Sequence, residues 1–111
     1  MLRTKSQVEK MCATCPMAKT ANLIGDTVSL LMIYQLMSGS KRFKDFIEAL
    51  PEVSSATLTN KITILEEYGL VTKERFNEKP PRVEYSLTPK GKGLKALIGA
   101  LRKYGEKHLM K

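Results

Sequence analysis

Apolar residues in the first third of the chain recur at the spacing of two helices. Residues 16–24 predict a short first helix, because Pro16 fits the first helical position and apolar residues follow at helical intervals. A Gly-Asp pair at 25–26 interrupts this pattern. Residues 27–37 are apolar nearly all round, so they predict a central buried helix that Ser-Gly-Ser at 38–40 ends.

The next two segments have the pattern of a helix-turn-helix pair. A third helix carries apolar residues at positions i, i+3, i+4 and i+7, namely Phe43, Phe46, Ile47 and Leu50. Pro51 disfavours helical geometry in the residue before it and so ends this helix. Ser54 is suited to cap a fourth helix that runs to about Tyr68, and Gly69 fits the position after a helix end. The inner face of the fourth helix carries Leu58, Ile62 and Leu65.

The remaining pattern predicts a hairpin and a last helix. Residues 71–76 and 82–87 alternate in polarity, as strands do, and residues 77–81 join them as a long tip. Thr88 and Pro89 supply an N-cap and a first-turn proline for the last helix. That helix carries an apolar stripe of Leu94, Leu97, Ile98 and Leu101.

This order of elements, α-α-α-α-β-β-α, predicts a mainly α protein with a small β-hairpin, the plan of a winged helix-turn-helix. We expect a single domain over residues 1–111. Within it, 1–15 is an N-terminal arm, 41–88 the helix-turn-helix plus wing, and 89–111 a C-terminal dimerisation helix and tail. The apolar stripe could pack within one subunit or between two, and in a chain with so small a core we favour homodimerisation through the terminal helices.

The polar face of the fourth helix and the cations around it predict a surface for double-stranded DNA. Short hydroxyl and amide side chains let a helix enter a major groove closely, and this surface carries Ser55, Ala56, Thr59, Asn60, Lys61 and Thr63. Basic residues within reach of phosphates precede the third helix and flank the hairpin tip: Lys41, Arg42, Lys44, Lys79 and Arg82. Either set could be an ordinary solvated face, but the adjoining hairpin favours DNA recognition.

The net charge of +8 lies mainly at the C-terminal end. Residues 1–40 carry four basic and two acidic side chains, residues 41–88 carry eight of each, and residues 89–111 carry seven basic and one acidic. A DNA surface in the middle segment therefore requires that charges segregate onto faces. No apolar run approaches the ~20 residues of a membrane span, and the start lacks a signal-peptide pattern, so we expect a cytoplasmic protein.

Two cysteines and one histidine limit the possible chemistry. With His108 alone, no catalytic or metal-binding His cluster forms within a chain, so we expect no enzyme activity, metal or cofactor. The pair Cys12-x-x-Cys15 could be a thioredoxin-like site, a zinc site shared between two chains, a regulatory thiol or two ordinary reduced thiols. The first of these needs a βαβ setting that this pattern lacks. Because Cys15 directly precedes Pro16, we expect its sulfur near the positive end of the first helix, where thiolate is favoured.

Several segments resemble the HxlR-type family of bacterial and archaeal winged-helix regulators. They are Ile-Gly-Asp at 24–26, Lys-Arg-Phe-Lys-Asp-Phe at 41–46, Leu-Thr-Asn-Lys-Ile at 58–62, Leu-Glu-Glu-Tyr-Gly-Leu-Val at 65–71 and Pro-Pro-Arg-Val-Glu-Tyr-Ser-Leu-Thr-Pro-Lys-Gly at 80–91. The last is the most specific. The resemblance runs from Cys15 to about Gly105 and implies a homodimer that binds an operator near a regulated gene. It also implies that Cys15 is a sensing residue, as the matching cysteine is in some members. Cys12 has no assigned counterpart in the family and could be a resolving partner or a bystander.

The chain departs from this family on the fourth helix. Members often carry extra basic residues where this chain has Ala56 and Thr63. We therefore expect base contacts to depend on Asn60, Thr59 and Ser55, with Lys61 as the single charge.

Two rival functions belong to other classes. A winged-helix module that binds a partner protein would show an exposed apolar patch on the fourth helix, whereas this helix is polar. A thiol oxidoreductase would need a substrate site or a second redox cofactor, for which the sequence offers no candidate. The sequence indicates no particular small-molecule effector.

Overall fold

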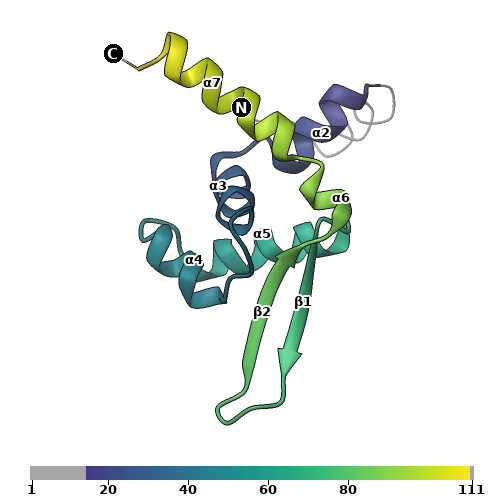
Figure 1. Cartoon of the computed structure of the whole chain (residues 1–111), viewed down its shortest axis with the longest axis vertical. Helices are drawn as coiled ribbons and strands as arrows, with labels where there is room; N and C mark the ends of the chain where they lie inside the picture. Colours follow the sequence, from purple (N-terminus) through teal and green to yellow (C-terminus); the bar gives the residue numbers. More distant parts are fainter. Residues whose placement is uncertain (1–14, 111) are drawn as a thin grey trace.

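A computed structural model of the chain describes residues 15–110, so Cys12 and the predicted arm before Cys15 lie outside the described residues. The elements follow in the order α2 (Pro16–Ile24), α3 (Thr27–Leu36), α4 (Phe43–Ala49), α5 (Ser55–Glu67), β1 (Val71–Phe76), β2 (Arg82–Leu87), α6 (Pro89–Lys92) and α7 (Lys95–His108). The predicted fold class, mainly α with one β-hairpin in winged helix-turn-helix order, is confirmed (Figure 1).

The prediction of one continuous last helix was wrong. Thr88 caps α6 through a hydrogen bond from the Gly91 N–H to its hydroxyl oxygen, at 3.0 Å. The chain then tightens, because the N–H groups of Gly93 and Leu94 donate to carbonyls three residues back. The break has a physical reason, since different elements hold the two helices. The start of α6 is fixed to the start of β1, whereas α7 packs toward α3 through the buried side chain of Ile98.

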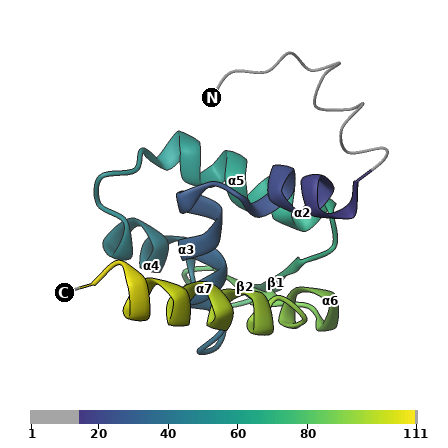
Figure 2. The same ribbon diagram turned by 90° about the horizontal axis from the view of Figure 1, so that it is seen from above.

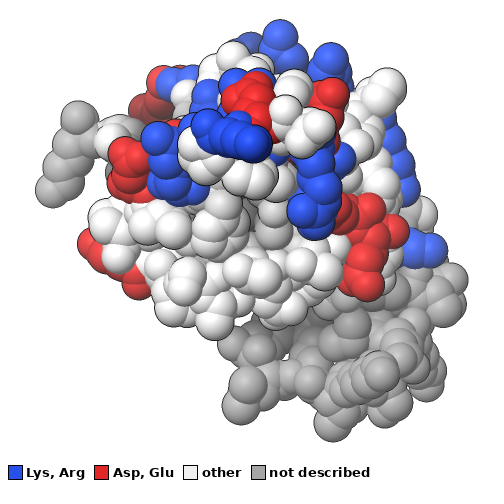
Figure 3. Space-filling model, turned by 90° about the horizontal axis from the view of Figure 1, so that it is seen from below, with Lys and Arg blue, Asp and Glu red and all other residues white. Residues whose placement is uncertain are grey.

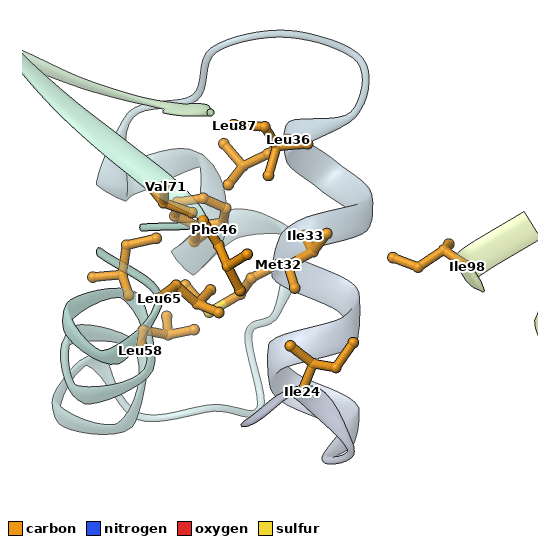
Figure 4. Close-up of a cluster of buried hydrophobic side chains, with 12 residues drawn as sticks. Ile24, Met32, Ile33, Leu36, Phe46, Leu58, Leu65, Val71, Leu87 and Ile98 are labelled. Atoms are coloured by element: carbon orange, nitrogen blue, oxygen red, sulfur yellow. The ribbon is translucent and has the colours of Figure 1, made fainter. Parts of the chain in front are cut away.

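The core is built around α3, which lies between α5 and α7 in both ribbon views (Figures 1 and 2). Figure 4 shows side chains of α3, α4, α5 and the hairpin converging, with Ile98 approaching from α7. The buried apolar residues are Ile24, Met32, Ile33, Leu36, Phe46, Leu58, Ile62, Leu65, Leu70, Val71, Leu87 and Ile98. The predicted inner face of α5 is thereby confirmed.

Two expectations about burial were wrong. On α3, Leu31 and Tyr34 are each 40% exposed, so this helix is not buried all round. On α4, Ile47 is 43% exposed while Phe46 is fully buried, so the inner face of α4 is narrower than its sequence pattern. Leu31 and Tyr34 border a hollow between α3 and α7, so α7 covers them only in part.

The hairpin begins directly after α5 because Gly69 adopts a left-handed conformation, with φ of +76°. Its strands pair antiparallel, from Val71 opposite Leu87 at the base to Phe76 opposite Arg82 at the tip. The backbone of Lys41 also exchanges two hydrogen bonds with that of Tyr85, at 2.9 and 2.7 Å. This bridge ties the start of α4 to β2.

A corner formed by Thr88–Gly91 packs on the junction between α5 and β1. The Thr88 hydroxyl donates to the carbonyl of Gly69 at 2.6 Å, and the Thr88 N–H donates to that of Leu70 at 3.0 Å. The Lys90 ammonium donates to the carbonyl of Tyr68 at 2.7 Å. These bonds fix the base of the hairpin against the end of α5.

We predict that Gly91→Ala destabilises the fold. A Cβ at Gly91 would collide with the carbonyl of Leu70 and lie 3.1 Å from a methyl of Leu87, so the corner would have to open. The expected loss in the free energy of unfolding is at least about 1–3 kcal/mol, the usual range for overpacking. Gly99→Ala is the matched control, since a Cβ there meets nothing within 4 Å and alanine favours a helix by up to about 1 kcal/mol. Urea denaturation that ranks the two variants equally would contradict this account.

Candidate nucleic-acid interface

From Ser55 to Thr63 the outer face of α5 is exposed and uncharged, and an exposed carboxylate follows at Glu67, the last residue of the helix. Ser55, Ala56, Thr59, Asn60 and Thr63 are all exposed there, opposite the buried face of the helix. The Thr63 hydroxyl donates to the carbonyl of Thr59 at 2.8 Å, whereas the Asn60 amide makes no hydrogen bond to any described residue. Figure 3, seen from the end of the molecule where the hairpin tip lies, shows a broad uncharged area in its lower half, over α5. This face therefore offers hydroxyl and amide groups to a ligand.

Lys61 does not belong to this outer face. It lies at the flank of α5 and forms an ion pair with Asp26, with 3.4 Å between its Nζ and Oδ2 of the carboxylate. Burial raises the pKa of Asp26, but hydrogen bonds from Ser29 and the charge of Lys61 outweigh this effect and leave the pKa below its ordinary value of 3.8. The single charge that the sequence places on the outer face is therefore already neutralised.

The three cations around the start of α4 have different surroundings. The Lys41 ammonium donates to the Ser38 hydroxyl at 3.1 Å. Arg42 is half-buried at the N-cap of α4, where its backbone N–H donates to Oδ2 of Asp45 at 2.8 Å. Lys44 is exposed and has no polar partner among the described residues. Of these cations, Lys44 is the most available to a phosphate.

At the wing, the tip residue Lys79 is exposed, but Arg82 is engaged. The Arg82 guanidinium lies 2.9 Å from a carboxylate oxygen of Glu78 and 3.3 Å from one of Glu84, and 4.1 Å above the ring of Phe76. Its positive charge is balanced within the hairpin. Arg82 orders the tip through these contacts.

Two wing cations were missed by the sequence analysis. Lys73 and Arg75 are exposed on β1, and their partners in the register are Tyr85 and Val83. Cross-strand partners share a face of a sheet, so both cations lie on the face that also carries the buried Val71 and is turned toward the helices. Residues 71–76 do not alternate in polarity, since the four residues between Val71 and Phe76 are all polar and exposed. Because successive side chains of a strand point to opposite faces, counting in steps of two from Val71 could have identified Lys73 and Arg75.

Tyr85 couples the wing to α4. Its ring lies 6.3 Å from that of the buried Phe46, and burial, aided by the charge of Glu66 and opposed by that of Arg75, raises the pKa of its phenol above the ordinary value of 10.0. Tyr85 is therefore a neutral packing residue at physiological pH.

The predicted dimerisation stripe on α7 divides into two parts. Ile98 is 5% exposed and Leu94 is half-buried against the core, whereas Leu97 and Leu101 are 38% and 49% exposed. Beside them, a hollow of about 330 Å³ between α3 and α7 is lined by Leu30, Leu31, Tyr34, Ile98, Leu101 and Arg102. Arg102 crosses this hollow and donates to the hydroxyl of Tyr34 at 3.0 Å. Among the described residues, α3 and α7 together therefore carry a continuous part of the exposed apolar surface, with Met17, Ile47 and Tyr68 exposed on other elements.

Cys15 lies at the N-cap of α2, as predicted. Its sulfur accepts a hydrogen bond from the backbone N–H of Ala18 at 3.4 Å, and its side chain is half-buried. The partial positive charge of the helix end is directed at this sulfur.

Within residues 15–110, no group of three or more His, Cys, Asp or Glu side chains could hold a metal ion. No helix in the same range is long and apolar enough to cross a membrane.

The helix pair α4–α5, the tight turn between them, the exposed polar face of α5 and the adjoining hairpin define a winged helix-turn-helix DNA-binding protein. The family model described as "HxlR-like helix-turn-helix" matches residues 23–111, and the chain belongs to this family. It is a DNA-binding transcriptional regulator, and the expected resemblance is confirmed.

Relatives of known sequence and structure agree with this assignment. The chain is 35% identical over 94 residues to the HTH-type transcriptional regulator YdeP of Bacillus subtilis, covering 85% of this chain and 73% of YdeP. It is 33% identical to the HTH-type transcriptional regulator YodB of the same organism, covering 83% of each. The structure of the redox regulator HypR in its reduced form matches with a TM-score of 0.80 and 32% identity, covering 84% of this chain and 92% of HypR.

Proposed function

We propose that the protein is a cytoplasmic, non-enzymatic regulator that binds a near-palindromic operator as a homodimer. In each subunit α5 enters the major groove, and Asn60, Thr59 and Ser55 face the base edges. Lys44 and the wing cations Lys73, Arg75 and Lys79 contact phosphates on either side. The observation that carries this proposal is the exposed, uncharged outer face of α5 with unpaired cations on the neighbouring elements.

The same surface argues against a protein-binding role for α5. A helix that packs on a partner protein presents an apolar patch, but Ala56 is the only apolar residue among the five exposed on the outer face of α5. The large exposed apolar side chains of Leu31, Tyr34, Leu97 and Leu101 lie instead on α3 and α7. Protein contact therefore fits α3 and α7, and DNA contact fits α5.

Asn60 and Lys79 are predicted to act differently on DNA binding. Asn60→Ala should relax the choice of base at one operator position, because an amide paired with adenine contributes about 1–3 kcal/mol of discrimination. Lys79→Ala should weaken binding to all duplexes and reduce the slope of log affinity against log salt by about 0.9 per subunit. Fluorescence anisotropy titrations with a set of single-base operator variants, at several salt concentrations, measure both effects.

The control for this pair is Lys103→Ala, which removes an exposed lysine from α7, away from the proposed DNA interface. It should leave both the salt slope and the base preference unchanged. A uniform loss of affinity in Asn60→Ala, with the base preference of the wild type, would remove Asn60 from base readout.

We infer that the exposed apolar surface of α3 and α7 is covered by a second subunit. Leu101→Asp should convert the dimer to a monomer in sedimentation velocity, because it buries a charge in the contact. It should also weaken operator binding strongly, since one subunit makes only half the contacts. Ile47→Asp, an exposed apolar residue on α4, is the control and should leave assembly intact. A wild type that sediments as a monomer at micromolar concentration would contradict the dimer.

We further propose that Cys15 controls DNA binding through its oxidation state. Its sulfur lies at the positive end of α2, and the related HypR has been solved in reduced and oxidised forms, with TM-scores of 0.80 and 0.81 to this chain. Diamide takes two electrons and two protons from a pair of thiols, and we propose that the pair is Cys15 of each of the two subunits. It should therefore change the operator affinity of the wild type and of Cys12→Ser, but leave that of Cys15→Ser unchanged. Equal responses in the wild type and Cys15→Ser would exclude Cys15 as the switch.

A further inference from the structure

One ion pair connects the proposed recognition helix to another element of the fold. Within residues 15–110, the Lys61–Asp26 pair is the only ion pair that joins two different elements outside the hairpin, and it links α5 to the elbow between α2 and α3. Figure 2 shows this elbow passing beside α5. Neither residue contributes to the apolar core.

A helix-capping hydrogen bond holds the carboxylate of Asp26 at the start of α3. Its Oδ2 accepts the backbone N–H of Ser29 at 3.0 Å and so caps α3, and the same oxygen lies 3.4 Å from Nζ of Lys61. Because Ser29 is buried and α3 is the centre of the core, Asp26 cannot follow the lysine toward DNA. The lysine must leave the carboxylate if it is to bind anything else.

Lys61 lies within reach of the DNA that α5 would contact. Lys61 follows Asn60 directly, so its Cα lies about 100° around the helix axis from the Cα of Asn60, which is on the outer face. The side chain is only 28% exposed while it is paired, and its four-carbon stem is flexible. Released from Asp26, the ammonium could turn toward the phosphates that border the groove.

We propose that Asp26 is a specificity-determining residue that withholds Lys61 from the DNA backbone. Phosphate contacts add affinity for every sequence alike, whereas the uncharged face of α5 distinguishes bases. By neutralising the one cation on α5, Asp26 lowers binding to random DNA more than binding to the operator. Asp26 is a positioning residue, since it acts through Lys61 and not by touching DNA. The proposal rests on the placement of α5 in the major groove.

Asp26→Asn separates this role from the capping of α3. Asparagine caps a helix about as well as aspartate, so α3 should keep its start while Lys61 loses its partner. Affinity for a random-sequence duplex should rise up to about fivefold per subunit near 0.15 M salt, and the salt slope should steepen by about 0.9 per subunit. The ratio of operator affinity to random-duplex affinity should fall.

Three further proteins make the result interpretable. In the Lys61→Gln background, Asp26→Asn should have no further effect on random-duplex binding, because the cation it would release is absent. Glu106→Gln makes the same change in net charge on α7, by freeing Arg102. Sedimentation velocity checks that this variant assembles as the wild type does, and its DNA binding should then match that of the wild type. Thermal melts of each variant confirm that it is folded.

The possible results separate a failure of the proposed role of Asp26 from a failure of the proposed DNA-binding function. An Asp26→Asn variant with wild-type affinity and slope, or one whose gain persists in Lys61→Gln, overturns the role of Asp26. Weaker binding in a folded Asp26→Asn variant also overturns it, since the pair would then assist binding. A wild type that binds no duplex would instead contradict the proposed function.

Discussion

The close contact between Thr88–Gly91 and the end of α5 is the constraint on which the DNA-binding arrangement depends. Hydrogen bonds from Thr88 and Lys90 satisfy the carbonyls of three successive residues, Tyr68, Gly69 and Leu70. These carbonyls lie where the helix has ended and the strand has begun, so they would otherwise need water. Gly91 is required because any larger residue would separate the two segments. The wing therefore leaves α5 in one fixed direction.

This fixed geometry allows the elements to divide the work of recognition. α5 offers an uncharged face, the wing and the start of α4 offer cations, and α3 with α7 offers exposed apolar surface. Since α3 lies between α5 and α7, the proposed DNA contact and the proposed subunit contact are on separate sides of one core (Figure 2). Asp26 lies at the elbow before α3 and forms an ion pair with Lys61 of α5. Within residues 15–110, this is the only ion pair between α5 and another element.

Local sequence patterns predicted most of the fold because each element carries its own signals. Ser54, Gly69 and Thr88 mark helix ends through side-chain or backbone preferences that act within a few residues, and each lies where it was expected. The break between α6 and α7 could not be predicted this way. It results from two distant attachments, one at Leu70 and one around Ile98, that a continuous helix could not satisfy together.

The site was predicted less completely because charge pairing is a matter of tertiary structure. Asp26 is 35 positions before Lys61, and no local pattern indicates that they meet. Arg82 was selected for its position at the hairpin tip, but pairing with Glu78 and Glu84 determines what it can do. Lys73 and Arg75 can be assigned to one face of the wing once the register is known, because their cross-strand partners are Tyr85 and Val83. Residue type thus indicated a candidate surface, and packing determines which of its charges are unpaired.

In the proposed complex, two copies of α5 occupy successive major grooves on one side of a duplex. Methylation interference on duplexes selected from a random pool tests it directly, because methylation at N7 of guanine blocks the major groove alone. We expect interference in two half-sites whose centres are about 10 base pairs, or roughly 34 Å, apart. Binding that tolerates N7 methylation throughout the protected region, or interference confined to a single half-site, would contradict it.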